Sequence, residues 1–104
     1  ARAVVPLGIY GVLVNCLPAE RVPACLAELK SVAPYIPVGA YANAGWMNRD
    51  GTWEPSLGAD PVAYAEAADE WIRSGARIVG SCCGTTVGHI CHLRKRIDAT
   101  LAMN

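Results

Sequence analysis

The chain has 104 residues, and its nine Lys and Arg balance nine Asp and Glu, so the formal net charge is zero. That charge gives no electrostatic reason to expect a nucleic acid or an anionic membrane as a partner, and 53% apolar residues exclude a disordered tail. The length suits one small domain, and no apolar run approaches the roughly 20 residues of a membrane span. The first residue is Ala1 rather than Met, which suggests a piece of a longer protein.

The cysteine content favours a reduced compartment. The chain has five cysteines, an odd number, and two of them are adjacent. A disulfide scaffold usually has an even number at spread spacings, and adjacent cysteines close only a strained small ring. Together with the absence of a visible secretory leader, this predicts a cytoplasmic chain with metal-binding or packed thiols.

The first third of the chain predicts a strand followed by a helix. Residues 9–16 are nearly all apolar and rich in β-branched side chains, which is typical of a strand buried on both faces. Apolar residues then recur at helical spacing, which predicts a helix over residues 19–33 that ends just before Pro34.

The middle of the chain predicts a short strand, a long loop and a second helix. The strand covers residues 37–41, and the loop covers residues 42–59 and is long enough to suggest a function. Asp60 and Pro61 are a good helix start, and Gly75 ends the helix. Its expected apolar stripe consists of Val62, Ala65, Ala68 and Ile72.

The last third predicts a strand over residues 77–82 and a helix that follows Thr86 and runs to about Thr100. Three strand–helix repeats imply an α/β fold with parallel strands. Such a sheet has two open edges and buries little apolar surface alone. We therefore expect residues 1–104 to form a single partial domain of a larger barrel or sheet, which associates with itself or with the missing portion.

Chemistry-bearing side chains come at the ends of all three predicted strands. Cys16 closes the first strand, Asn43 lies just past the second, and Cys82 and Cys83 close the third. Because the carboxyl ends of parallel strands meet at one edge, we expect these side chains to lie together. Three thiolates suit Zn²⁺, but Cys82 and Cys83 reach one ion only if the strand breaks between them. Gly84 supplies that freedom.

The remaining candidates have ordinary structural interpretations. Cys25 and Cys91 fall within predicted helices, where we expect packed thiols. His89 and His92 are expected to be ordinary helix residues, with His89 bonding to the loop at the strand end. A fourth ligand such as His89 would instead make the metal site closed and structural. Thr85 and Thr86 are expected to cap the last helix.

Three short motifs then point to a family. The segment GSCCGTT from Gly80, followed by His89, resembles the GGCCGTTPEHI signature of the homocysteine S-methyltransferase family. Residues 14–16 resemble its GVNC motif, and residues 41–45 resemble its Y-x-N-A-G motif. The resemblance runs over about residues 9–97 and covers the last three βα units of an eight-unit barrel. The departures are Leu13, Ser81, Val87 and Gly88, which stand where the family has Gly, Gly, Pro and Glu.

The resemblance implies the C-terminal part of a (β/α)8 TIM barrel and a zinc-dependent transfer of a methyl group to the thiol of homocysteine, which forms methionine. It implies Cys16, Cys82 and Cys83 as the zinc ligands. The partners are then homocysteine and a sulfonium, ammonium or folate-type methyl donor. Asn43 either binds the amino-acid end of homocysteine or orders the loop. We expect the 104 residues alone to be inactive.

Three alternatives stay open from the residues. The first is a non-catalytic structural zinc-binding module, and the second is an assembly fragment of enzymatic ancestry. The third is a redox protein that uses Cys82 and Cys83 as a switch. Metal analysis of the reduced protein separates the redox alternative from the other two.

Overall fold

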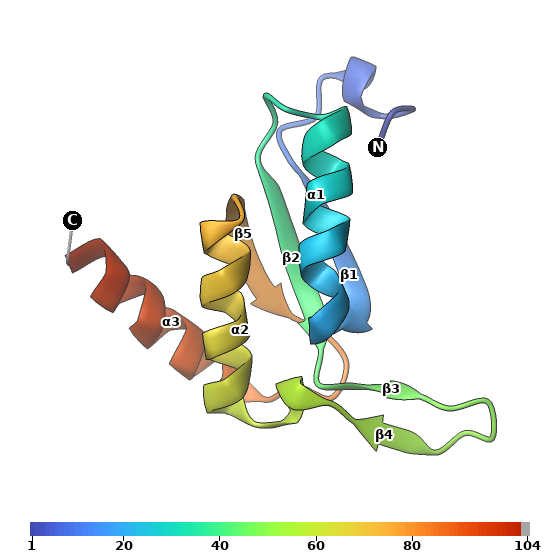
Figure 1. Cartoon of the computed structure of the whole chain (residues 1–104), viewed down its shortest axis with the longest axis vertical. Helices are drawn as coiled ribbons and strands as arrows, with labels where there is room; N and C mark the ends of the chain where they lie inside the picture. The colour runs from blue at the N-terminus through green and yellow to red at the C-terminus, as the bar shows by residue number, and fades with distance from the viewer. Residues whose placement is uncertain (103–104) are drawn as a thin grey trace.

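The computed structural model describes residues 1–102 and has a parallel three-stranded sheet at its centre. The strands are β1 (Val12–Pro18), β2 (Val38–Asn43) and β5 (Ala76–Ser81), and their order in the sheet is β1-β2-β5. Figure 1 shows them running side by side, with β2 in the middle. The predicted α/β class and the parallel strand direction are therefore confirmed.

A helix follows each of these strands. The helices are α1 (Val22–Val32), α2 (Pro61–Arg73) and α3 (Val87–Ala102). Asp60 caps α2 as predicted, since its Oδ2 accepts the N–H of Ala63 at 3.0 Å. Short 3₁₀ helices are η1 (Val5–Leu7), η2 (Ala19–Arg21) and η3 (Leu57–Ala59). The first turn of the helix that we predicted over residues 19–33 is therefore the separate η2.

The long loop that we predicted over residues 42–59 is wrong in its middle part. There β3 (Gly45–Met47) and β4 (Trp53–Pro55) form an antiparallel hairpin, which projects beyond the C-terminal ends of β1 and β2 (Figure 1). Its turn holds Asp50 and Gly51, and Gly51 has φ +88°. Both the turn residues and the flanking tryptophans are typical of a hairpin.

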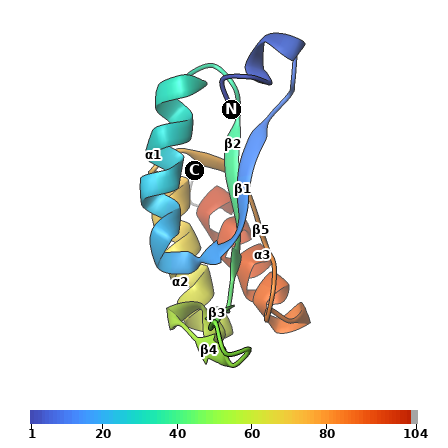
Figure 2. The same ribbon diagram turned by 90° about the vertical axis from the view of Figure 1, so that its right-hand side faces the viewer.

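The hydrophobic core lies between one face of the sheet and the helices α1 and α2, which cover that face (Figure 2). The sheet contributes mainly small side chains, among them Val38, Ala40 and Ala42. Our predicted stripe of α2 is wrong at both ends, because Val62 is 43% exposed and Ile72 only half-buried. The buried face instead consists of Tyr64, Ala65, Ala68 and Trp71.

The opposite face of the sheet is open in the part of the chain that the structure describes (Figure 2). Leu13, Gly39 and Ile78 share this face, since they pair in register across the three strands. Gly39 lets β2 and β5 approach closely, because a Cβ there would lie 2.3 Å from the carbonyl oxygen of Ile78. An arc of parallel strands covered on one side is consistent with part of a TIM barrel.

None of the helices within residues 1–102 combines the length and the apolar character that crossing a bilayer requires.

Candidate metal centre

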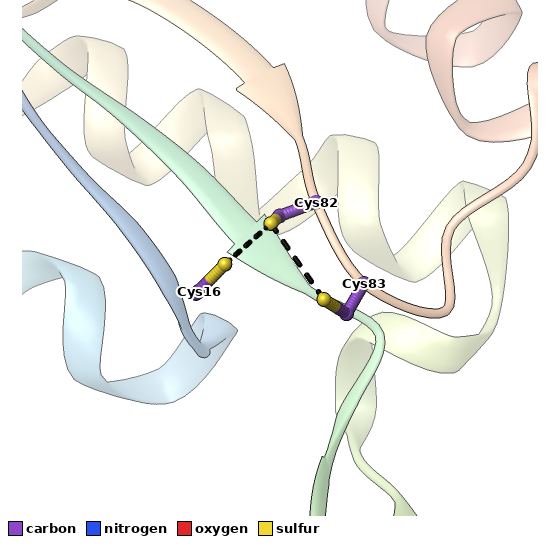
Figure 3. Close-up of side chains that lie close together, drawn as sticks. All are labelled: Cys16, Cys82 and Cys83. Carbon is purple, nitrogen blue, oxygen red and sulfur yellow. Dashed lines mark hydrogen bonds between the residues drawn. The ribbon is translucent and has the colours of Figure 1, made fainter.

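Three cysteine sulfurs meet at the C-terminal edge of the sheet. The Sγ atoms of Cys16, Cys82 and Cys83 all lie within 4.8 Å of one another. Cys16 comes from β1, and the other two come from the turn after β5, and all three point toward the end of β2 (Figure 3). The Sγ–Sγ distance is 2.7 Å between Cys16 and Cys82 and 3.8 Å between Cys82 and Cys83. The convergence predicted from the strand ends is therefore present.

Cys16 reaches the cluster through an irregular backbone. Its φ is +58°, the left-handed region that L-residues adopt at a cost of about 1–2 kcal/mol. The β1–β2 ladder also shifts register between Asn15 and Pro18. Such irregularities re-aim a side chain, and this one directs the Cys16 thiol along the sheet edge toward Cys82.

The strand β5 ends at Ser81, so Cys82 and Cys83 both lie beyond it and need not alternate between faces. The N–H of Cys82 donates to the carbonyl oxygen of Ala42 at 3.0 Å. The N–H of Cys83 donates to Oδ1 of Asn43 at 3.0 Å. Gly84 then turns the chain with φ +79°, as expected. Hydrogen bonds to the end of β2 thus fix the positions of both cysteines.

Asn43 is 8% exposed and is the last residue of β2. Its Oδ1 contact with Cys83 corresponds to the loop-ordering role that the sequence left open. The Ala44 N–H also donates to the Cys83 carbonyl oxygen at 2.9 Å. Residues 43 and 44 therefore bind both the N–H and the carbonyl oxygen of Cys83.

His89 is buried and fully engaged, at 2% exposure. Its Nδ1 accepts the N–H of Thr86 at 3.0 Å, so Nε2 carries the proton and donates to the carbonyl oxygen of Gly58 at 2.9 Å. The expected bond from His89 to the strand-end loop is therefore confirmed. Thr85 does not cap α3, because its hydroxyl donates to the Cys82 carbonyl oxygen at 2.6 Å.

The two other cysteines lie away from the cluster, on helices, and all five are free thiols. Cys25 on α1 is half-buried, as a packed thiol should be. Cys91 on α3 is exposed, so its predicted packing is wrong. The helix α3 turns Leu93 inward, and the position two residues earlier lies on its outer side.

The close thiols shift one another's pKa. The hydrogen bond between Cys16 and Cys82 raises the pKa of Cys16 to about 11, and removal from water and the nearby Cys83 add to this. The same hydrogen bond lowers the pKa of Cys82 below its usual range. Cys82 therefore ionises before Cys16, because a second negative charge within a few ångströms is unfavourable.

This donor set fits a soft or borderline metal ion. Zinc binds thiolate sulfur at about 2.3 Å, so two ligands of a tetrahedral site are about 3.8 Å apart. The Cys82–Cys83 distance of 3.8 Å equals that value, whereas the Cys16–Cys82 distance of 2.7 Å is shorter, so these two sulfurs would have to separate by about 1 Å to ligate zinc. Cys16 and Cys83 are exposed residues, so a fourth position at the cluster is reachable from solvent. The cluster can hold a metal ion through three sulfurs.

The comparison with known proteins agrees with the motifs. A family model described as Homocysteine S-methyltransferase matches residues 1–97. The chain belongs to this family.

Individual relatives carry the same name. The chain is 33% identical to a homocysteine S-methyltransferase of Bacillus subtilis over 86 residues, which are 81% of this chain and 25% of the relative. It is 33% identical to the homocysteine S-methyltransferase of Escherichia coli over 95 residues, 89% of this chain and 28% of the relative. It is 32% identical to a betaine-homocysteine S-methyltransferase of Drosophila melanogaster over 94 residues, 86% of this chain and 27% of the relative. The chain thus spans about a quarter of these relatives.

The sequence analysis does not predict two contacts near the cysteines. Trp53 of the hairpin packs against the cysteine turn, since a Cβ at Gly84 would lie 2.6 Å from its ring. Tyr64 of α2 reaches the strand ends with its hydroxyl. The spacing of Tyr64, Ala68 and Trp71 is helical and would have revealed this aromatic face.

The pKa shifts predict the order in which the metal-free thiols react. At pH 7.5, iodoacetamide should label Cys82 faster than Cys16, because the thiolate is the reactive form. Labelling of Cys16 should become fast only as the pH approaches 11. Mass spectrometry of the digested protein gives each rate, with the exposed Cys91 as internal reference.

Cys16→Ala should slow the labelling of Cys82 several-fold, since it removes the hydrogen bond that favours the Cys82 thiolate. Cys25→Ala is the matched control, because Cys25 is a thiol on α1 outside the cluster, and it should change neither rate. Equal rates for Cys16 and Cys82 in the unmodified chain would contradict this electrostatic account.

Proposed function

We propose that Cys16, Cys82 and Cys83 bind one zinc ion, and that this centre serves the transfer of a methyl group to the thiol of homocysteine, which forms methionine. The observation that carries the proposal is the meeting of three sulfurs from two strand ends at an accessible edge. Membership in the homocysteine S-methyltransferase family supports it.

The chemistry requires a thiolate. A free thiol is largely protonated at neutral pH, and the thiolate is the nucleophile. When bound, zinc supplies an open coordination position for the substrate sulfur and a positive charge that lowers its pKa. With three thiolate ligands the centre would carry a net negative charge, which would keep the substrate sulfur electron-rich as a nucleophile toward the methyl donor.

Asn43 is the proposed substrate-binding residue. Its Oδ1 is engaged with the N–H of Cys83, so its Nδ2 amide is the group that would donate to the carboxylate of homocysteine. In this arrangement one side chain both places a metal ligand and orients the substrate.

An open fourth position is favoured over a closed structural site. His89 is the candidate for a fourth protein ligand, but both of its ring nitrogens already make hydrogen bonds to the backbone. A zinc site with three protein ligands and one free position is typical of catalysis.

The rest of the barrel is proposed to come from outside these residues. A closed barrel needs roughly 250 residues, and this chain spans about a quarter of its relatives. The 104 residues alone are therefore proposed to lack activity, and the complete enzyme is proposed to act in the cytoplasm.

Substitution of single cysteines tests the metal assignment. Cys16→Ser, Cys82→Ser and Cys83→Ser should each lower the zinc content of the reduced protein from about one equivalent toward zero, since each removes one of three thiolates. Cys25→Ser is the matched control, because Cys25 is a thiol on α1 outside the cluster. Zinc analysis after dialysis measures the content, and the assignment is wrong if Cys25→Ser loses as much metal as Cys83→Ser.

The open sheet predicts association. The strands β1 and β5 each have an edge unpaired by the described residues, and the face that carries Leu13 and Ile78 is apolar. Burying such surface is worth roughly 25 cal/mol per Å², and unpaired edges recruit further strands. Multi-angle light scattering at micromolar concentration should therefore give a dimer or larger assembly. A monodisperse, folded monomer would contradict the open-edge argument.

A further inference from the structure

A single buried hydroxyl links the ends of β2 and β5 beside the candidate metal centre. Tyr64 of α2 is 0% exposed, and its hydroxyl oxygen lies 2.7 Å from the carbonyl oxygen of Ala42 and 2.8 Å from that of Gly80. A phenol has one proton, so the two carbonyls share it. Ala42 belongs to β2 and Gly80 to β5. The hydroxyl therefore bridges neighbouring strands one or two residues before Asn43 and Cys82.

The acceptors of this hydroxyl also take part in placing the cysteines. The carbonyl oxygen of Ala42 accepts the N–H of Cys82 as well as the Tyr64 hydroxyl. The next residue along β2, Asn43, holds Cys83. A change in the separation of β2 and β5 at this level would move both contacts at once.

The ring of Tyr64 is held independently of its hydroxyl. It makes edge-on contacts with Trp71 at 5.4 Å and with His89 at 5.3 Å between ring centroids. A phenylalanine ring would make the same contacts. The hydroxyl is therefore the part of the side chain that acts on the strand ends. Burial raises the pKa of Tyr64, so the hydroxyl stays protonated at pH values where the cysteines ionise.

We propose that Tyr64 is a positioning residue whose hydroxyl fixes the spacing of β2 and β5 at their C-terminal ends and so holds Cys82 and Cys83 in ligating geometry. The inference rests on the proposed function, namely that the three cysteines bind a metal ion. Contacts beyond the ligands themselves orient them, and their loss typically weakens metal binding by 10–100-fold.

Cobalt(II) binding by the reduced 104-residue chain tests this proposal. Co²⁺ reports its thiolate ligands through charge-transfer and d–d absorption bands. Tyr64→Phe should weaken Co²⁺ binding about tenfold and change the d–d bands, because it removes only the shared hydroxyl. Circular dichroism checks that the variant is folded.

A matched control separates positioning from stability. Val38→Ala creates a cavity at the opposite end of β2, where the side chain is 2% exposed. It should lower the melting temperature and leave the Co²⁺ affinity and spectrum unchanged. If both variants lose affinity in proportion to their loss of stability, Tyr64 is merely structural and the proposal is overturned.

The same titration distinguishes failure of the proposed metal site from failure of the proposed role of Tyr64. If the unmodified chain shows no cobalt–thiolate bands, the proposed metal site fails and this inference fails with it. If the unmodified chain binds Co²⁺ and Tyr64→Phe binds it with equal affinity and an identical spectrum, only the inference about Tyr64 is overturned.

A measurement on the unmodified chain applies if Tyr64→Phe does not fold. Cadmium(II) added to protein labelled with ¹³C at the tyrosine Cζ should shift the Tyr64 resonance, because its hydroxyl contacts the strand ends that hold the metal ligands. The Tyr35 resonance is the reference, since that side chain is 97% exposed and lies in the loop before β2. An unchanged Tyr64 resonance in the presence of bound Cd²⁺ would overturn the proposal.

Discussion

Three thiols held within 4.8 Å are the constraint on which the candidate site depends. Without a cation the sulfurs do not all ionise near neutral pH, because negative charges at such distances repel. The fold nevertheless brings them together through the positive φ of Cys16 and through hydrogen bonds from the cysteine turn to the Ala42 carbonyl oxygen and the Asn43 side chain. Strain of this kind persists where the surrounding structure over-determines it. A metal ion would relieve the repulsion that the backbone imposes.

The end of β2 organises this edge of the molecule. Its Ala42 carbonyl receives the N–H of Cys82 and the hydroxyl of Tyr64, and its Asn43 side chain receives the N–H of Cys83. The hairpin that follows places Trp53 against Gly84, and His89 ties the start of α3 to η3. These contacts fix the hairpin and the start of α3 next to the cysteine turn and the end of the middle strand.

The sequence predicts the parallel sheet and the meeting of Cys16, Cys82 and Cys83 because strand ends in such sheets share an edge. It does not predict how Cys16 is turned toward the others, since a positive φ at a non-glycine residue depends on tertiary contacts. The hairpin was missed although its Asp50–Gly51 turn is a recognisable signal. Val62 and Ile72 predict the wrong face for α2, because the rings of Tyr64 and Trp71 fill the core. The exposure of Cys91 depends on the packing of α3, which periodicity alone does not determine.

The central claim is that three protein thiolates hold zinc and leave one position for the sulfur of homocysteine. X-ray absorption at the zinc edge of the reduced, zinc-loaded chain tests it most directly. The account predicts three sulfur neighbours at about 2.3 Å and one lighter neighbour, with a fourth sulfur replacing the lighter neighbour when homocysteine is added. A spectrum with a histidine nitrogen as the fourth neighbour, unchanged by homocysteine, would contradict the account.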